Sequence, residues 1–197
     1  MSDAQTPDSA RRRATRARLV EAAHVEFGRL GIDATSVERI CEVAGFTRGA
    51  FYSNFTSKDD LCVAVAQDVV DRTLQASNDA IKTLQPDTSP AEIIASILGA
   101  ASLSEDQHRT QLELQLRGWR DPDLGARLAA VRASTQPVAV QVITTAAQRL
   151  GLRFVVPTAD FIRIVEALFF APSLAQEGTA ERLMTLVSSH LTEQVER

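Results

Sequence analysis

Residues 34–61, ATSVERICEVAGFTRGAFYSNFTSKDDL, decide the fold of the N-terminal part of the chain. Thr35 can cap a helix, and Glu38 follows three residues later, as a capping box requires. Gly45 suits the end of this helix, because glycine readily adopts the left-handed conformation that follows a last turn. Between them, apolar residues recur at the spacing of one helical face: Val37, Ile40, Cys41 and Ala44.

A shorter helix is predicted directly afterwards. Thr47 can cap it, and Phe51 and Phe55 are large enough to anchor it to a core. A helix, a tight turn and a second helix form the arrangement that presents one helix to the major groove of DNA. The outer face of the second helix would keep Arg48, Tyr52, Ser53 and Asn54.

A third helix is expected to begin at Lys58, with Ser57 as its cap and Asp60 as a box-like partner. A lysine in the first turn faces the positive end of the helix dipole, which is unfavourable. The position is easier to explain if a phosphate group also lies there. Caps, apolar faces and a glycine between helices occur in many small helical domains, so these patterns alone leave a domain without DNA-binding function open.

The distribution of charge favours DNA binding. The chain of 197 residues has a formal net charge of −4, yet residues 9–58 contain nine basic and five acidic side chains. A basic end on an acidic chain is typical of a protein that binds phosphate at that end. Five basic residues are expected to follow phosphates or enter a minor groove, the alternative being a solvated helix face: Arg11, Arg12, Arg13, Arg16 and Arg18.

Residues 13–61 resemble the DNA-binding domain of the TetR family of bacterial transcriptional regulators. The segments A-G-x-T-R-G-A-F-Y-x-x-F and S-K-D-D-L have the family's spacing, although Asn54 stands where the family often has histidine or another aromatic residue. We therefore expect a disordered tail over residues 1–10, a helix-turn-helix domain over 11–57 and a helical ligand-binding and dimerisation domain over 58–197. The candidate DNA contacts are Arg13, Arg16, Thr35, Ser36, Thr47, Arg48, Gly49, Tyr52, Asn54 and Lys58.

The remaining sequence predicts an all-α protein of about nine helices. The run from Phe154 to Val156 is strand-like but too short to build a sheet. Pro137 lies within an apolar helical pattern, so that helix is expected to be kinked or split. The expected helices after the helix-turn-helix cover roughly residues 58–84, 93–98, 104–118, 122–150, 158–171 and 179–191.

Two further surfaces are expected in the C-terminal domain. The resemblance implies a small-molecule site, for which the polar and aromatic candidates are His108, Gln111, Gln115, Trp119 and Phe161, each of which could instead fill a core or lie on the surface. Glu113 and Arg117 are interpreted as an intrahelical ion pair. The helix from residue 158 is apolar around most of its circumference, which favours a second buried face against a twin subunit. The expected dimer residues are Phe161, Val165, Leu168, Phe169, Leu183, Val187, His190 and Leu191.

Other classes of protein are disfavoured by what the sequence lacks. It contains no nucleophile elbow, glycine-rich phosphate loop or HExxH motif, so no catalytic residue is expected. The histidines and cysteines lack ligand-like spacing, so neither a metal nor a cofactor is expected, and Cys41 and Cys62 are interpreted as buried apolar residues. With no secretory segment and no long apolar run, the protein is expected to be cytoplasmic and not to contact membranes.

The sequence thus predicts a ligand-responsive repressor that binds double-stranded DNA as a homodimer. Its operator would have inverted symmetry, because a two-fold dimer presents two equivalent helices. A ligand-independent architectural DNA-binding dimer stays open as the alternative, since the effector site rests on resemblance. Effector, operator and the sign of regulation are not encoded in recognisable motifs.

Overall fold

The computed structural model describes residues 7–83, 104–149, 151–169 and 179–194. These residues form α-helices and one small two-stranded sheet, which confirms the all-α fold class. They divide into two compact units. The first contains the described residues up to Val69 and those from 104 to Val131, and the second contains the others.

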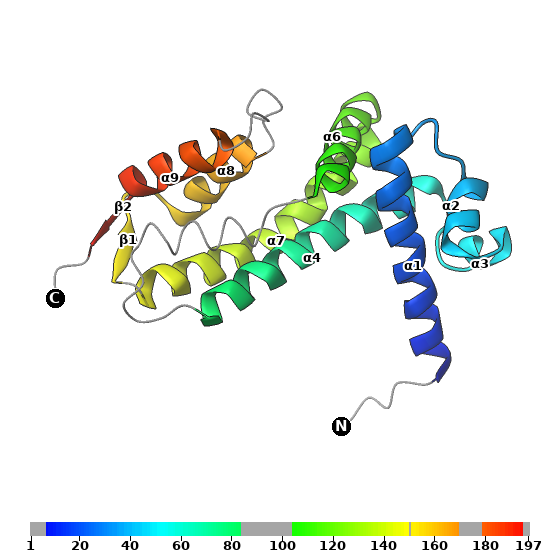
Figure 1. Ribbon diagram of the computed structural model, residues 1–197, viewed down its shortest axis with the longest axis horizontal. Helices are drawn as coiled ribbons and strands as arrows, with labels where there is room; N and C mark the ends of the chain where they lie inside the picture. The colour runs from blue at the N-terminus through cyan, green and yellow to red at the C-terminus, as the bar shows by residue number, and fades with distance from the viewer. Residues whose placement is uncertain (1–6, 84–103, 150, 170–178, 195–197) are drawn as a thin grey trace. The chain divides into compact units, whose positions relative to one another are not determined.

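In the first unit, α1 contacts both α2 and α6. Figure 1 shows α2 and α3 on one side of α1 and α6 on the other. Two longer helices, α4 and α7, contribute only their N-terminal parts to this unit. The helices are α1 (Pro7–Leu30), α2 (Val37–Ala44), α3 (Arg48–Tyr52), α4 (Lys58–Thr83), α6 (Glu105–Arg120) and α7 (Pro122–Arg149).

The core of the first unit contains the aromatic anchors expected from the sequence. Phe51 is fully buried and Phe55 is almost so, while Phe27 from α1 is also fully buried. Burying a side chain of this size contributes roughly 1.5–3 kcal/mol, which is large for a five-residue helix such as α3. The helix is therefore held by its packing against α2 and by the burial of Phe51 in this core rather than by its own length.

A glycine brings α1 and α6 together. A Cβ atom added at Gly28 would lie 2.5 Å from the main-chain oxygen of Asp106, closer than real Cβ contacts allow. The two helices can approach to this distance because residue 28 has no side chain.

The second unit contains the rest of α4 and α7, followed by β1 (Leu152–Phe154), α8 (Thr158–Phe169), α9 (Thr179–Leu191) and β2 (Thr192–Gln194). The strands pair antiparallel with Leu152 opposite Gln194, so the expectation that no sheet forms was wrong. β1 is stabilised by pairing with β2, about 40 residues later in the chain, and no local sequence pattern predicts this pairing. α7 is one helix that includes Pro137, so it is not split there.

Two other expectations differ from the structure or lie outside it. α1 begins at Pro7, inside the segment expected to be a tail, and proline suits a first helical position because its missing N–H has no partner there. The helix expected near residues 93–98 lies outside the described residues. Within the described part of the chain, no helix is both long and apolar enough to cross a membrane.

Candidate DNA-binding site

α2 is capped by Ser36 and not by Thr35. The Ser36 Oγ accepts a hydrogen bond from the Arg39 N–H at 3.1 Å. Thr35 is fully buried, and its hydroxyl lies 2.7 Å from the Gly31 carbonyl oxygen that accepts from it. Thr35, which carries a methyl group, is thus the side chain that packs into the core. Ser36 remains at the helix end and serves as the cap. The expected contact between the Thr35 side chain and a phosphate was therefore wrong, whereas Ser36 is exposed.

The turn between α2 and α3 has the geometry expected from the sequence. Gly45 follows α2 with φ +71°, in the left-handed region, and its N–H bonds to carbonyls of the preceding turn. Thr47 caps α3 and accepts from the Ala50 N–H at 3.2 Å. These local bonds fix the direction in which α3 leaves the turn.

Four residues of α3 and its cap, Thr47, Arg48, Gly49 and Tyr52, form an exposed surface that we call the α3 face. Half of the Tyr52 surface is accessible to solvent. The Arg48 guanidinium lies 2.6 Å from the Glu38 carboxylate and 5.8 Å from the centroid of the Tyr52 ring. The phenol and Glu38 both raise the pKa of Arg48, which stays cationic.

Asn54, by contrast, does not project from this surface. Its Nδ2 donates to the Ala50 carbonyl oxygen at 2.8 Å, and its Oδ1 is buried. The side chain folds back over the end of α3 because the short helix leaves carbonyl oxygens that need donors. In the free protein the Asn54 amide is thus used within α3, and its contact with a base stays a prediction.

Lys58 also points inward. Its Nζ donates to the Ile32 carbonyl oxygen at 2.7 Å and to the Thr35 carbonyl oxygen at 3.2 Å. These two acceptors explain a cation in the first turn of α4 without a phosphate. Lys58 thus stabilises the loop between α1 and α2 in the free protein, and its contact with DNA stays a prediction.

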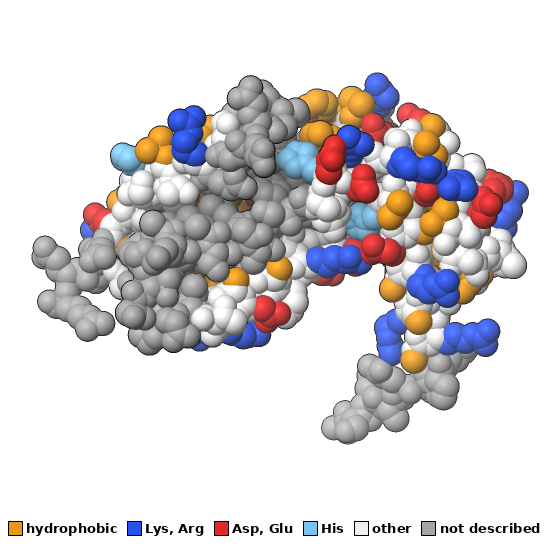
Figure 2. All heavy atoms as spheres, in the orientation of Figure 1, with side chains coloured by type: hydrophobic (Ala, Val, Ile, Leu, Met, Phe, Trp, Pro, Cys, Tyr) orange, Lys and Arg blue, Asp and Glu red, His pale blue; other side chains and the backbone are white. Residues whose placement is uncertain are grey.

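The basic part of α1 is exposed, as Figure 2 shows for the Lys and Arg side chains along its N-terminal half. Arg13 and Arg16, the two candidates there, are both exposed. Arg16 also contacts the protein itself, since its Nη1 donates to the Asn54 carbonyl oxygen at 3.0 Å.

A buried carboxylate that the sequence analysis missed joins α1 to α2. Glu26 is almost fully buried, and its Oε2 lies 2.9 Å from both Arg39 Nε and Arg29 Nη2. Hydrogen bonding from Arg39, opposed by burial and assisted by Arg29, holds the pKa of Glu26 below its ordinary value. The sequence signal of this contact is that Glu26 lies on an otherwise apolar helical face.

α6 is tied to the first unit by polar contacts over long sequence separations. Glu113 Oε2 accepts from the Ile32 N–H at 3.1 Å, and the Thr110 hydroxyl donates to the His24 carbonyl oxygen at 2.9 Å. Arg117 pairs with Asp33 and Asp59. Glu113 and Arg117 therefore bind the loop after α1 and the start of α4, and their interpretation as an intrahelical pair was wrong.

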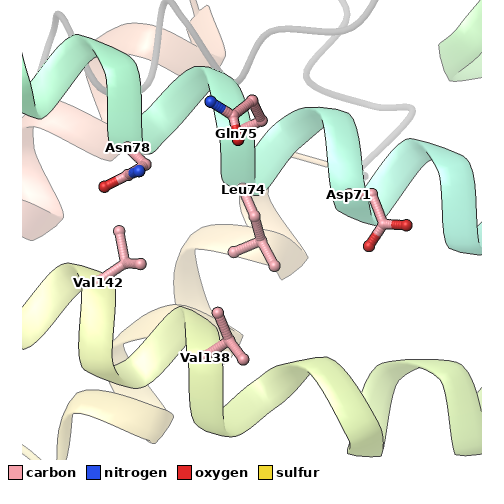
Figure 3. A pocket seen from close by; sticks show the side chains of 6 residues that line it. All are labelled: Asp71, Leu74, Gln75, Asn78, Val138 and Val142. Carbon is pink, nitrogen blue, oxygen red and sulfur yellow. The ribbon is translucent and has the colours of Figure 1, made fainter. Parts of the chain in front are cut away.

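Within the described part of the chain, the five residues expected to line an effector site lie in different surroundings. Trp119 is 83% exposed, and Phe161 is buried with its ring centroid 4.6 Å from that of Phe154. Gln111 is buried in the first unit, while His108 and Gln115 are partly buried there. None of the five is among the residues that line one open cavity of the described structure: Asp71, Leu74, Gln75, Asn78, Val138 and Val142 (Figure 3).

The expected dimer residues occupy different environments on α8 and α9. Phe161 is buried within its own unit and is not on the surface, which corrects its place in a dimer contact. His190 is exposed. The side chain of Phe169 lies outside what the structure describes. The partly buried members are Val165, Leu168, Leu183, Val187 and Leu191.

Both cysteines are buried, as expected, and neither forms a disulfide. Burial raises the pKa of the Cys62 thiol to about 12, so it is a poor nucleophile. Among the described residues, no group of His, Cys, Asp and Glu side chains is arranged to hold a metal ion.

Known proteins resemble both the helix-turn-helix and the longer chain. The family model for bacterial regulatory proteins of the tetR family matches residues 19–65. The HTH-type transcriptional regulator UidR of Escherichia coli (strain K12) is 25% identical over 186 residues, covering 90% of this chain and 93% of UidR. The HTH-type transcriptional regulator TtgR of Pseudomonas putida is 43% identical over 51 residues, covering 26% of this chain and 24% of TtgR.

Solved structures share the fold. A putative TetR-family regulator from Mesorhizobium loti MAFF303099 aligns with a TM-score of 0.70 at 17% identity, covering 91% of this chain and 96% of that one. Salmonella enterica GusR aligns with a TM-score of 0.66 at 18% identity, covering 94% and 95%. The match over the helix-turn-helix segment, the similarity of most of the chain to UidR and the shared fold together support a DNA-binding transcriptional regulator of the TetR family.

Proposed function

We propose that the protein is a repressor that binds an operator of inverted symmetry as a homodimer and leaves it when a small-molecule effector binds. The observation that carries the proposal is the α3 face, which is exposed while Phe51 and Phe55 on the same segment are buried. A surface of this kind, fixed by packing and rich in hydrogen-bond donors, suits the major groove.

The members of the α3 face have distinct proposed roles. Arg48 can donate two parallel bonds to a guanine edge, and Glu38, 2.6 Å away, would orient it until DNA is bound. Gly49 has no side chain, so the main chain can approach the DNA closely. Thr47 and Tyr52 would contact phosphate oxygens through their hydroxyls, and Ser36 would do so at the start of α2.

The proposed dimer uses α8 and α9, which contact each other within the second unit. Ile164 on α8 and Leu186 on α9 are exposed although both are large and apolar, which supports coverage by a twin subunit. We expect Leu186→Glu to give a monomer in sedimentation velocity. Val25→Glu, at another exposed apolar residue on α1, should stay dimeric, and two dimeric variants would contradict this interface.

The proposed effector site is the cavity of about 330 Å³ in the second unit. Figure 3 shows Leu74 and Asn78 of α4 directed toward Val138 and Val142 of α7. Three apolar side chains, two amides and the Asp71 carboxylate favour a neutral or cationic ligand with an apolar body and hydrogen-bonding groups. Since α4 and α7 each contribute to both units, a change in their separation is the proposed route to the DNA-binding helices.

The DNA-binding part is tested by selection from random duplexes, followed by sequencing. An enriched inverted repeat with half-sites about one helical turn (roughly 34–36 Å) or slightly more apart is expected. Arg48→Ala should lower the ratio of operator affinity to scrambled-duplex affinity by about ten- to a hundred-fold per half-site. Arg109→Ala on α6, also exposed and paired with an acid, is the matched control and should keep that ratio.

The results of this selection distinguish a sequence-specific repressor from an architectural DNA-binding protein. Salt-sensitive binding without a sequence motif would indicate an architectural protein and overturn the repressor proposal. If a motif is found, a reporter gene behind it shows the sign of regulation, and activation by the protein would contradict repression.

The effector part is tested by thermal unfolding with a compound library. A ligand that binds only the folded protein raises the unfolding temperature by mass action. Val142→Phe should abolish that shift by filling the cavity, whereas Thr145→Phe, at an exposed position of α7 outside the lining, should keep it. A shift that survives Val142→Phe would place the ligand elsewhere.

A further inference from the structure

Three arginines of α1 contact the two ends of α3. Arg12 Nη2 donates to the Ser53 carbonyl oxygen at 2.9 Å, and Arg16 Nη1 donates to the Asn54 carbonyl oxygen at 3.0 Å. At the other end of α3, the Arg18 guanidinium lies 4.8 Å from the ring centroid of Phe46, which precedes the cap of the helix.

The acceptors are main-chain carbonyls that α3 cannot satisfy by itself. Ser53 is the C-terminal cap of a five-residue helix, and the last carbonyls of a helix have no partner within it. These carbonyls carry partial negative charge, so a guanidinium is a favourable donor there. A helix of this length has almost no stability of its own, and its orientation depends on such external contacts.

Arg16 makes a second contact that fixes its position. Its guanidinium carbon lies 4.2 Å from the ring centroid of Phe55, which is buried in the core. Burial also lowers the pKa of Arg16, with Asp60 acting in the opposite direction. The Arg16 side chain is exposed overall, but its guanidinium already contacts the Asn54 carbonyl oxygen and the Phe55 ring at the end of α3.

We propose that Arg12, Arg16 and Arg18 are positioning residues that orient α3 and thereby set the sequence preference of the regulator. They act on DNA recognition through the α3 face and not through bonds to phosphate. The proposal rests on the DNA-binding role of the family, but its structural part concerns the free protein.

The first test needs no DNA. Amide hydrogen exchange is measured over residues 48–55 in the full-length protein, for Arg16→Met and for Arg11→Met. Both variants remove one positive charge from α1, but Arg11 is an exposed residue of the first turns. We expect exchange in α3 at least ten-fold faster in Arg16→Met and unchanged in Arg11→Met. Equal rates in wild type and Arg16→Met would overturn the proposal.

The second test uses the duplex selected by the wild-type protein and a scrambled duplex of the same composition. Arg16→Met should weaken operator binding by ten-fold or more with little change for the scrambled duplex and an unchanged salt slope. A phosphate contact predicts the opposite: both duplexes weakened equally and a slope reduced by about 0.9 per lost contact. That result would overturn the proposal.

Arg16→Lys guards against a folding defect. Lysine keeps the charge and one donor for the Asn54 carbonyl oxygen, so specificity and slow exchange should be partly restored. Failure of lysine to restore either property would count against positioning by this bond. If the wild type selects no DNA motif, the proposed function fails, while the exchange result still decides whether these arginines hold α3.

Discussion

The guanidinium of Arg117 on α6 and the carboxylate of Asp59 in the first turn of α4 form an ion pair, with Nη2 and Oδ1 3.0 Å apart. Arg117 also pairs with Asp33 in the loop after α1. One side chain of α6 thus joins two segments that border the helix-turn-helix. Its removal should therefore lower the stability of the first unit.

We expect Arg117→Met to lower the free energy of unfolding by about 1 kcal/mol, because the partly buried Asp59 and the exposed Asp33 lose their shared donor. Urea unfolding measures the change, and 1 M NaCl should reduce it by screening the pairs in the wild type. Arg120→Met is the control, since that guanidinium is mostly exposed and lies 3.9 Å from Asp33. Equal losses in the two variants would contradict a specific role for Arg117.

Lys58→Met should also act on stability. Removing the ammonium takes one donor from the Thr35 carbonyl oxygen and one from the Ile32 carbonyl oxygen, which keeps only the Thr35 N–H at 3.3 Å, and this should cost about 1–2 kcal/mol by urea unfolding. The salt slope of DNA binding should stay at the wild-type value, because no phosphate contact is lost. A stable Lys58→Met with a lower slope would restore the phosphate role that the sequence suggested. Lys82→Met, at an exposed lysine later in α4, controls for loss of charge.

The local features of the helix-turn-helix could be predicted because they depend on neighbours in the sequence. Thr47 as a cap, Gly45 as a terminator and Phe51 as an anchor follow from spacing within one or two turns. Lys58 and Glu113 could not be placed, because their partner Ile32 is 26 and 81 residues away and only helix packing brings them together. The cavity likewise combines α4 with α7, which no local pattern relates.

Gly28→Ala should destabilise the protein by about 1–3 kcal/mol. Its Cβ would meet a main-chain oxygen of α6, and neither helix can yield without losing other contacts. Thermal or urea unfolding measures this effect. Wild-type stability in Gly28→Ala would contradict the close approach of α1 and α6.

Gly49→Ala, unlike Gly28→Ala, should leave the stability of the protein intact and act on DNA binding. The nearest atom to an added Cβ is Thr47 Oγ1 at 3.7 Å, an ordinary contact, and alanine favours a helix by up to about 1 kcal/mol over glycine. Stability should therefore be kept or raised, while affinity for the selected operator falls if the main chain approaches DNA at this position. Unchanged operator affinity in a titration would contradict a close approach of the main chain to DNA at Gly49.

Glu26 should give the protein a measurable acid dependence. Its folded pKa lies below the ordinary value of 4.5, chiefly because Arg39 donates to the carboxylate. The unfolded chain therefore takes up this proton at higher pH than the folded chain does. The stability contributed by the ionised carboxylate is complete above about pH 4.5 and is lost as the pH falls through the folded pKa.

The matched variants for this dependence are Glu26→Gln and Glu21→Gln, which change a buried and an exposed acid on the same helix. We expect Glu26→Gln to be less stable than wild type at pH 7, because amide bonding to Arg39 and Arg29 is weaker than carboxylate bonding. The difference in the free energy of unfolding between wild type and Glu26→Gln should decrease as the pH is lowered, because protonation of Glu26 removes the stronger bonding of the carboxylate. Glu21→Gln should differ less from the wild type at pH 7, because Glu21 is exposed. A gap that stays constant down to the folded pKa would show that Glu26 contributes by shape and not by charge.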